Sequence, residues 1–299
     1  MIKSLNLDKT FIPTNFYSIN YEMLQFSGGE MHIKLDNSIL IDECKIESCE
    51  KVIITHRLRN GDDIMKVLIA QDALKRKGVK HFELVIPYVP YARQDRQCTE
   101  GESFTLDVFA KIINSAKFDK VITLDNHSDV STALIKNCKN IPNDDCVMMA
   151  VDNILSNPDQ HSHPITLKEL ILVSPDSGAN KKSNKLFDNL KCFKSLVKCD
   201  KRRNTTDGSL SGFEVFSNDL NGLDCLICDD LIDGGRTFIG IAQELKKKNA
   251  GNIYLFVTHG IFSYGFDELA KYFKKIYTTN SFKDIDHPLV EQFKISLYE

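Results

Sequence analysis

Residues 228–238, CDDLIDGGRTF, combine carboxylates, paired glycines and a threonine in a pattern suited to binding a phosphorylated sugar. An apolar run at residues 224–228 precedes this segment, and an amphipathic run at residues 238–248 follows it. A strand–loop–helix junction of this kind binds phosphate through free backbone N–H groups and the helix N-terminus. Gly234 and Gly235 would let the backbone approach a ligand closely.

Three side chains of the same segment add polar groups. Asp229 and Asp230 close the predicted strand, where their carboxylates can accept hydrogen bonds from sugar hydroxyls or share a cation with the ligand. Thr237 adds a hydroxyl donor and is expected to cap the helix. The spacing alone also allows a plain Asp/Gly turn before a capped helix. Binding of a phosphorylated sugar is therefore favoured only if other segments carry matching groups.

Two arginines follow an earlier predicted strand, in IPYVPYARQDR at residues 86–96. Two prolines lead the chain out of the strand. Arg93 and Arg96 then carry planar guanidinium groups suited to phosphate oxygens. An exposed basic loop is the alternative explanation.

Three further segments carry groups with catalytic or metal-binding chemistry. The groups are His127 in LDNHSD, Asp176 in SPDSGANKK, and Lys201 with Arg203 in CDKRRN. Each has an ordinary structural alternative: a capped turn for His127, a helix cap for Asp176 and a solvated charge run for the basic residues.

Short apolar runs alternate with amphipathic segments along most of the chain, which indicates parallel sheets with crossover helices. Strands are predicted at residues 51–55, 82–87, 120–124, 169–173, 192–198, 224–228 and 253–258. Helices are predicted at residues 62–77, 106–116, 181–190 and 238–248. The rhythm restarts after a polar, proline-containing stretch near residues 140–165. The sequence therefore predicts an α/β protein of two domains.

The composition of the 299 residues is that of a globular protein, with 42% hydrophobic and 26% charged residues. A formal net charge of −3 gives no basic excess for nucleic acid, and no long uncharged apolar stretch predicts a membrane span. The first residues lack the apolar region of a signal peptide. Nine cysteines at irregular spacing favour free thiols in a reducing compartment, so a cytoplasmic location is expected.

The 228–238 segment resembles the ribose-phosphate loop of the phosphoribosyltransferase superfamily. YARQDR at residues 91–96 resembles the ATP site of the PRPP synthetase (ribose-phosphate diphosphokinase) family. FSGGEMHIKL at residues 26–35 and the segments around His127, Asp176 and Lys201 follow in the order of that family. The resemblance covers most of the chain.

The resemblance implies a role for each matching residue. Lys201, Arg203 and His127 would be catalytic, and His127 and Asp176 would ligate Mg²⁺. The ATP-binding residues would be Phe26, Glu30, Arg93, Gln94, Asp95, Arg96 and His127. The ribose-phosphate-binding residues would be Asp229, Asp230, Asp233, Gly234, Gly235, Arg236 and Thr237.

The resemblance also implies two phosphoribosyltransferase-like domains with parallel-rich sheets flanked by helices. Residues 1–148 would form the ATP-side domain and residues 149–281 the ribose-phosphate domain, with residues 282–299 returning to the first. The partners would be ATP and an acceptor bearing ribose 5-phosphate, with Mg²⁺ as cofactor and no nucleic acid or membrane. Family members share Phe26-type contacts between subunits, so a homo-oligomer, a dimer or a hexamer, is expected.

The implied reaction transfers diphosphate from ATP to the 1-hydroxyl of ribose 5-phosphate, giving PRPP and AMP. Two departures from the family pattern bear on its substrates: Gly28 replaces an acidic residue of the adenine segment, and Asp-Gly-Gly-Arg-Thr at residues 233–237 replaces Asp-Thr-Ala-Gly-Thr. The added Arg236 suits a more anionic 5-substituent, so ADP-ribose is an alternative acceptor in NAD rebuilding. Arg236 could also point to solvent as a neutral change.

Two other classes stay open at this point. An inactive regulatory homologue would keep the fold and bind nucleotides without turnover. A plain phosphoribosyltransferase would use the 228–238 loop but would give no role to YARQDR or FSGGE.

Overall fold

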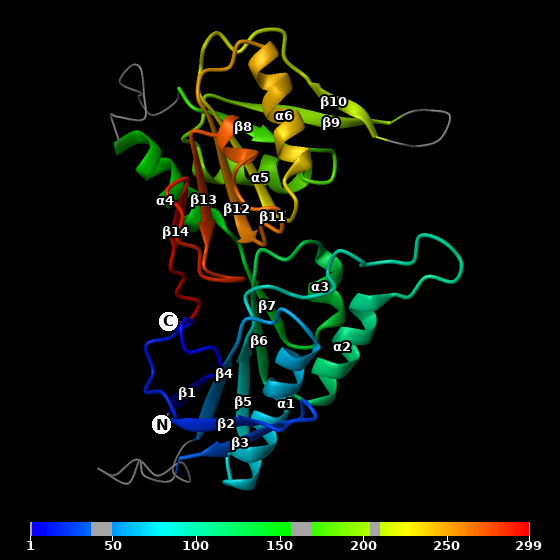
Figure 1. Cartoon of the computed structure of the whole chain (residues 1–299), viewed down its shortest axis with the longest axis vertical. Helices are drawn as coiled ribbons and strands as arrows, with labels where there is room; N and C mark the ends of the chain where they lie inside the picture. The colour runs from blue at the N-terminus through cyan, green and yellow to red at the C-terminus, as the bar shows by residue number, and fades with distance from the viewer. Residues whose placement is uncertain (1, 37–49, 157–168, 204–209, 299) are drawn as a thin grey trace. The chain divides into compact units, whose positions relative to one another are not determined.

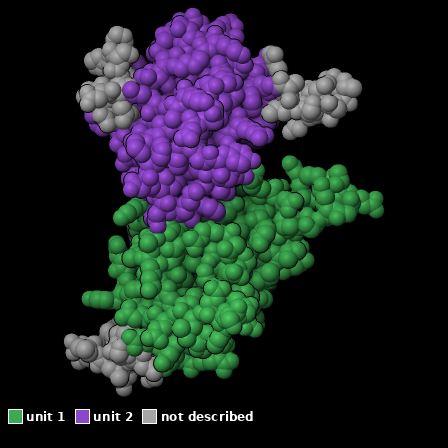
Figure 2. All heavy atoms as spheres, viewed as in Figure 1, with its two compact units in different colours: residues 1–142, 294–299 green, residues 143–293 purple. Residues whose placement is uncertain are grey.

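The computed structural model describes residues 2–36, 50–156, 169–203 and 210–298. The chain divides into two compact units (Figure 2). Unit 1 comprises Met1–Pro142 with Lys294–Glu299, and unit 2 comprises Asn143–Phe293. No helix in these described ranges is both long and apolar enough to cross a membrane.

Unit 1 is built on a parallel sheet in the order β1-β4-β5-β6-β7 (Figure 1). Its strands are β1 (Ile2–Asn6), β4 (Lys51–Thr55), β5 (His81–Val85), β6 (Lys120–Leu124) and β7 (Cys138–Ile141). Its helices are α1 (Gly61–Arg76), α2 (Thr105–Ser115) and α3 (Asp129–Leu134). Because every neighbouring pair of strands is parallel, their carboxyl ends meet at one edge of the sheet.

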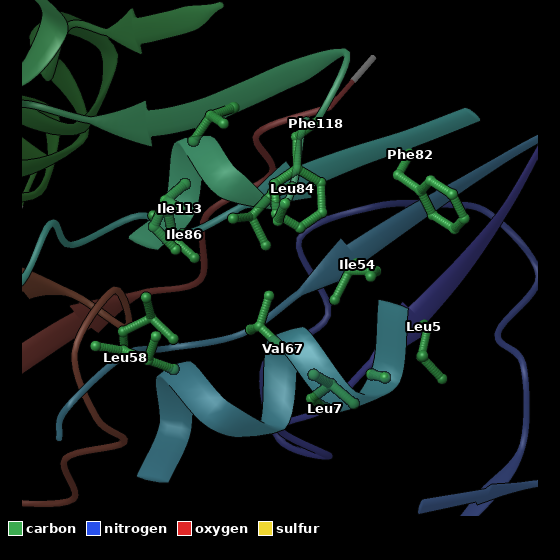
Figure 3. Close-up of a cluster of buried hydrophobic side chains, with 14 of the residues drawn as sticks. Leu5, Leu7, Ile54, Leu58, Val67, Phe82, Leu84, Ile86, Ile113 and Phe118 are labelled. Carbon is green, nitrogen blue, oxygen red and sulfur yellow. The ribbon is translucent and has the colours of Figure 1, made fainter. Parts of the chain in front are cut away.

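The first crossover helix, α1, has clear start and stop signals. The side chain of Asn60 accepts a hydrogen bond from the backbone N–H of Asp63 and caps the N-terminus. The helix ends before Gly78, whose φ of 90° suits glycine. Figure 3 shows the core it covers, where Val67 of α1, Ile54 of β4 and Leu84 of β5 are fully buried. Each such side chain stabilises the unit by about 1.5–3 kcal/mol.

Unit 2 has a seven-stranded sheet in the order β10-β9-β8-β11-β12-β13-β14. Its strands are β8 (Ile171–Ser174), β9 (Ser195–Arg203), β10 (Leu210–Val215), β11 (Cys225–Ile232), β12 (Ile253–Gly260), β13 (Lys275–Thr279) and β14 (Val290–Phe293). Its helices are α4 (Asp144–Ser156), α5 (Asn180–Leu190), α6 (Arg236–Lys247) and the 3₁₀ helix η3 (Leu269–Lys271). All pairs are parallel except β9 with β10, which form an antiparallel hairpin at one edge (Figure 1).

The predicted α/β architecture, with two units of parallel-rich sheet flanked by helices, is confirmed. The division between the units differs from the expected one. The stretch near residues 140–165 contains α4, whose buried face joins unit 2, so this unit begins at Asn143 and not at residue 149. The return to unit 1 is shorter than residues 282–299, because β14 pairs with β13 and the return begins at Lys294.

The returning segment is bound to the N-terminal part of unit 1. The backbone N–H of Leu297 donates to the carbonyl of Pro13 at 3.0 Å. Tyr298 packs edge-on against Phe16, with ring centroids 5.4 Å apart, and the Lys120 ammonium lies 5.4 Å from the Tyr298 centroid. These contacts make the end of the chain part of the core of unit 1.

Leu297→Ala is therefore expected to lower the free energy of unfolding by about 2–3 kcal/mol, because it removes a buried side chain and leaves a cavity. Urea denaturation followed by circular dichroism measures the loss. The neighbouring exposed Ser296 provides the control, and Ser296→Ala should change stability by less than about 0.5 kcal/mol. Equal effects of the two variants would contradict this view of the C-terminus.

Candidate active site

Three adjacent strands of unit 2 bring four of the predicted site residues to one edge of the sheet. The strand order β9-β8-β11 places these strands side by side, all parallel. Asp176 follows β8, Lys201 lies near the end of β9, and Asp229 and Asp230 lie in the second half of β11. Residues up to 54 positions apart in sequence therefore meet at the carboxyl edge, where open α/β sheets bind ligands.

Lys201 and Asp176 form a direct ion pair. The Lys201 Nζ donates to Asp176 Oδ2 at 2.7 Å, and both side chains are about one-quarter to one-third exposed, at 31% and 24%. The other oxygen, Asp176 Oδ1, accepts from the backbone N–H of Ala179 at 3.0 Å, at the start of α5. Asp176 thus supports the turn before the helix with one oxygen and holds Lys201 with the other.

Asp229 and Asp230 form a close carboxyl pair, half-buried and buried respectively. The backbone N–H of Asp230 donates to Asp229 Oδ1 at 2.9 Å. Burial raises the pKa of the Asp229 carboxyl well above its usual value, and the charges of Asp230 and, more weakly, Asp176 raise it further. A pair held in this way favours a ligand that donates hydrogen bonds or brings a cation.

The loop after β11 ends in a helix N-terminus built on glycine. Gly235 has a φ of 78° and is the N-cap residue of α6. The helix begins at Arg236, so Thr237 is its second residue and the expectation that Thr237 caps it is wrong. Because glycine offers no side-chain acceptor, the first N–H groups of α6 are directed at whatever lies in the loop, which suits an anion.

A second loop, residues 261–266 after β12, is bonded to the loop that follows β11. The backbone N–H of Ile261 donates to the Ile232 carbonyl at 2.9 Å. Ser263 bonds Asp233 twice: its N–H to the carbonyl at 3.2 Å, and its Oγ to Asp233 Oδ1 at 2.6 Å. The sequence patterns did not indicate a role for this loop. Its position after a strand that neighbours β11 was the available signal.

Tyr264 of the 261–266 loop lies against Gly234 of the loop that follows β11. A Cβ added to Gly234 would lie 2.8 Å from Tyr264 Cε2, so residue 234 has room for glycine alone unless the ring moves. The Arg236 guanidinium carbon lies 5.8 Å from the Tyr264 ring centroid, within range of a cation–π contact. Arg236 is exposed, yet it lies over an aromatic ring beside the glycine of the loop.

In unit 1, the arginine loop and His127 follow neighbouring parallel strands, β5 and β6. The Ile86 N–H donates to the Ile122 carbonyl at 3.0 Å, and the Leu124 N–H donates to the Pro87 carbonyl at 2.9 Å. The two segments therefore leave the same edge of the sheet. His127 is exposed, just before α3.

The residues within the arginine loop have different environments. Arg93 and Arg96 are exposed, and Arg96 Nε lies 3.9 Å from Asp95 Oδ1. Gln94 accepts from the Thr105 hydroxyl at 2.8 Å and through its carbonyl from the Leu106 N–H at 3.4 Å. Gln94 thus supports the start of α2, whereas Arg93 and Arg96 are exposed. Their predicted binding of ATP remains a proposal.

Phe26 and Glu30 lie at the tip of a separate hairpin of unit 1, β2 (Tyr21–Gln25) with β3 (Met31–Leu35). The Phe26 N–H donates to the Glu30 carbonyl at 2.9 Å, and Phe26 is 56% exposed. An exposed aromatic ring at a hairpin tip suits contact with a base or a neighbouring subunit, and that role stays a prediction.

Arg203 ends β9, but its side chain lies outside the described residues. Among the described residues, no three His, Cys, Asp or Glu side chains are grouped so that they hold a metal ion alone. Mg²⁺ commonly takes one or two protein carboxylates and completes its shell with substrate phosphates and water. The oriented, partly exposed carboxylate of Asp176 fits that mode of binding.

The fold and this edge of unit 2 define a phosphoribosyltransferase-type enzyme. One family model, the N-terminal domain of ribose phosphate pyrophosphokinase, matches residues 12–116, and the phosphoribosyl transferase domain matches residues 138–291. The chain belongs to the ribose-phosphate pyrophosphokinase family, whose members are transferases.

Curated relatives and a solved structure agree with this assignment. The ribose-phosphate pyrophosphokinase of Bacillus subtilis is 31% identical over 277 residues, covering 90% of this chain and 80% of the relative. That of Agrobacterium fabrum is 34% identical over 211 residues, 69% of this chain and 62% of the relative, so this match spans less than two thirds of its length. The phosphoribosylpyrophosphate synthetase structure from Mycobacterium smegmatis has a similar fold, with a TM-score of 0.78 and 21% identity, covering 98% of this chain and 94% of that one.

Proposed function

We propose that the protein transfers diphosphate from ATP to the 1-hydroxyl of ribose 5-phosphate and releases AMP. The Lys201–Asp176 ion pair beside Asp229 and Asp230 carries the proposal. This edge of the sheet offers a cation for phosphate charge, a carboxylate for Mg²⁺ and two acceptors for sugar hydroxyls. The names of the relatives support the same reaction.

The acceptor would be held at both ends of its ribose. Asp229 and Asp230 accept hydrogen bonds from the 2- and 3-hydroxyls. Burial and the charge of Asp230 disfavour the ionised form of Asp229, and these hydroxyl donors stabilise it. The first N–H groups of α6 and Thr237 bind the 5-phosphate. The 1-hydroxyl is then presented at a fixed place, which supplies much of the rate enhancement in phosphoryl transfer.

The donor would be held by the basic groups. In unit 1, Arg93 and Arg96 follow β5 and His127 follows the neighbouring strand β6, and these side chains suit phosphate oxygens of ATP. Mg²⁺ held by Asp176 and ATP phosphates would reduce the negative charge of the diphosphate. Lys201 donates to the oxygens on which charge develops, and such preorganised donors stabilise the transition state more than the ground state.

Incubation with MgATP and ribose 5-phosphate, followed by chromatography and mass spectrometry, tests the proposal. We expect AMP and a sugar that has gained two phosphate groups. Formation of ADP would indicate transfer of a single phosphate and would refute it. Nucleotide binding without turnover of any acceptor would instead indicate an inactive regulatory homologue.

A second acceptor, ADP-ribose, is favoured by one observation: Arg236 lies over Tyr264 and directly beside Gly234 of the phosphate loop. ADP-ribose has a free 1-hydroxyl and carries a second phosphate where a guanidinium would meet it. The same assay with ADP-ribose as the acceptor separates the two. Consumption of ribose 5-phosphate with no reaction of ADP-ribose would exclude the conjugate.

A further inference from the structure

Tyr264 is a large aromatic side chain that stays 73% exposed although it lies against the ribose-phosphate loop. An exposed ring on a surface loop is common by itself. This one, however, occupies the space beside Gly234 and underlies the guanidinium of Arg236. Its position beside Gly234 and Arg236 suggests that the ring contacts the ligand of this loop.

The backbone that carries Tyr264 is fixed. Ser263 is bonded to Asp233 through both its backbone and its hydroxyl group. Phe262, on the other side, is 4% exposed and packs on Phe266 with ring centroids 4.8 Å apart. The hydrogen bonds of Ser263 thus fix the backbone directly before Tyr264, and the Tyr264 ring lies against Gly234.

The same loop holds a strained residue. Phe262 has a φ of 50°, a left-handed conformation that a bulky side chain rarely adopts. Such conformations cost energy and persist where the surrounding structure enforces them, often at ligand sites. The strain turns the chain directly before Ser263 and Tyr264, so it sets where the ring lies.

We infer that Tyr264 is a stacking platform for a planar base attached beyond the 5-phosphate of the acceptor. With the 5-phosphate at the N-terminus of α6, a second phosphate would meet Arg236 and a base would lie on the exposed Tyr264 ring. The ligand class is a ribose joined through its 5-phosphate to a nucleoside phosphate. This inference rests on the proposed ribose-phosphate site of unit 2.

Titration calorimetry of the full chain with ADP-ribose and with ribose 5-phosphate tests the inference. The readout is the affinity for ADP-ribose divided by the affinity for ribose 5-phosphate. Base–aromatic stacking predicts that Tyr264→Ala lowers this ratio by about 5- to 150-fold. Tyr264→Phe keeps the ring and should keep the ratio. Tyr17→Ala, which removes an 86% exposed tyrosine of unit 1, is the matched control and should also keep it.

The outcomes separate failure of the inference from failure of the proposed function. If the wild-type chain binds ribose 5-phosphate but Tyr264→Ala leaves the ratio unchanged, the platform is wrong and the ribose-phosphate site stands. If the wild-type chain binds neither ligand, the site itself is wrong. The chain has no tryptophan, so Tyr264→Trp adds a single indole that is excited apart from the tyrosines, and ADP-ribose should quench its fluorescence more strongly than ribose 5-phosphate does.

Discussion

Lys201→Met is expected to lower kcat by about 10²- to 10³-fold while the protein stays folded. The variant keeps the length of the side chain but removes the ammonium that would donate to the transferring diphosphate, and loss of one such donor has an effect of this size. Steady-state kinetics with MgATP and ribose 5-phosphate measure it. Lys198→Met, on the same strand and exposed, is the control and should stay within a few-fold of the wild type.

The ion pair gives the same variant a second readout. The Lys201 ammonium is bonded to Asp176 Oδ2 at 2.7 Å, so a metal ion that binds this oxygen competes with it. Lys201→Met should therefore bind Mn²⁺, a paramagnetic substitute for Mg²⁺, more tightly in an electron paramagnetic resonance titration. Unchanged kcat together with unchanged metal affinity would contradict the role given to Lys201.

Asp229→Asn is expected to raise KM for the acceptor by about 10- to 100-fold, since the hydroxyl donors of the bound acceptor favour the ionised form of Asp229 and a hydrogen bond to a charged group contributes about 1.5–3 kcal/mol. The same variant should be more stable than the wild type at neutral pH. Burial and the Asp230 charge raise the pKa of Asp229 in the folded state, so the protonated form is favoured there. Protonated Asp229 therefore stabilises the folded state below the pKa of Asp in the unfolded chain, near 3.9. This stabilisation is lost as the pH rises from that value through the raised pKa of Asp229 in the folded state.

The pH dependence of unfolding provides the check. The advantage of Asp229→Asn over the wild type should grow from about pH 4 upward and vanish below it. Asp267→Asn, which removes an exposed carboxylate of unit 2, should show no such trend. An Asn variant that binds the acceptor normally, or that loses stability at neutral pH, would show that Asp229 is a structural residue.

The sequence predicted the strands and helices whose patterns are strong. The strands at residues 51–55 and 120–124 coincide with β4 and β6, and the helix at residues 62–77 coincides with α1 within a residue. These elements carry continuous apolar runs or a clear helical period. Strand β9 extends to Arg203 because charged residues pair with β10 there, which an apolar pattern cannot show.

Elements with weak local patterns were missed. Helix α4 begins Asp-Asp in a polar stretch that also contains prolines, and its buried residues become visible only when the sheet of unit 2 is in place. Strand β14 has four residues, two of them polar, and is defined by its pairing with β13. Tertiary contacts, and not propensity, decide such elements.

The site residues also divide into those that the sequence predicted and those that only the structure shows. Motif order placed Asp176, Lys201, Asp229 and Asp230 among the site residues, and the strand order then explains why they meet. The ion pair and the cover formed by Ser263 and Tyr264 join segments 25 to 30 residues apart, and no local spacing predicts such contacts. Replacement of the family's Thr-Ala by Gly234 and Gly235 was visible, but its partner Tyr264 was not.

Isotope tracing tests the central claim most directly. Ribose 5-phosphate labelled with ¹⁸O in its 1-hydroxyl is incubated with MgATP, and the products are analysed by mass spectrometry and ³¹P NMR. Attack of the 1-hydroxyl on the β-phosphorus predicts that the label lies in the bridge between C1 and the new diphosphate and that AMP is unlabelled. Loss of the label from the sugar product while the unreacted ribose 5-phosphate keeps it, or ADP in place of AMP, would contradict the account.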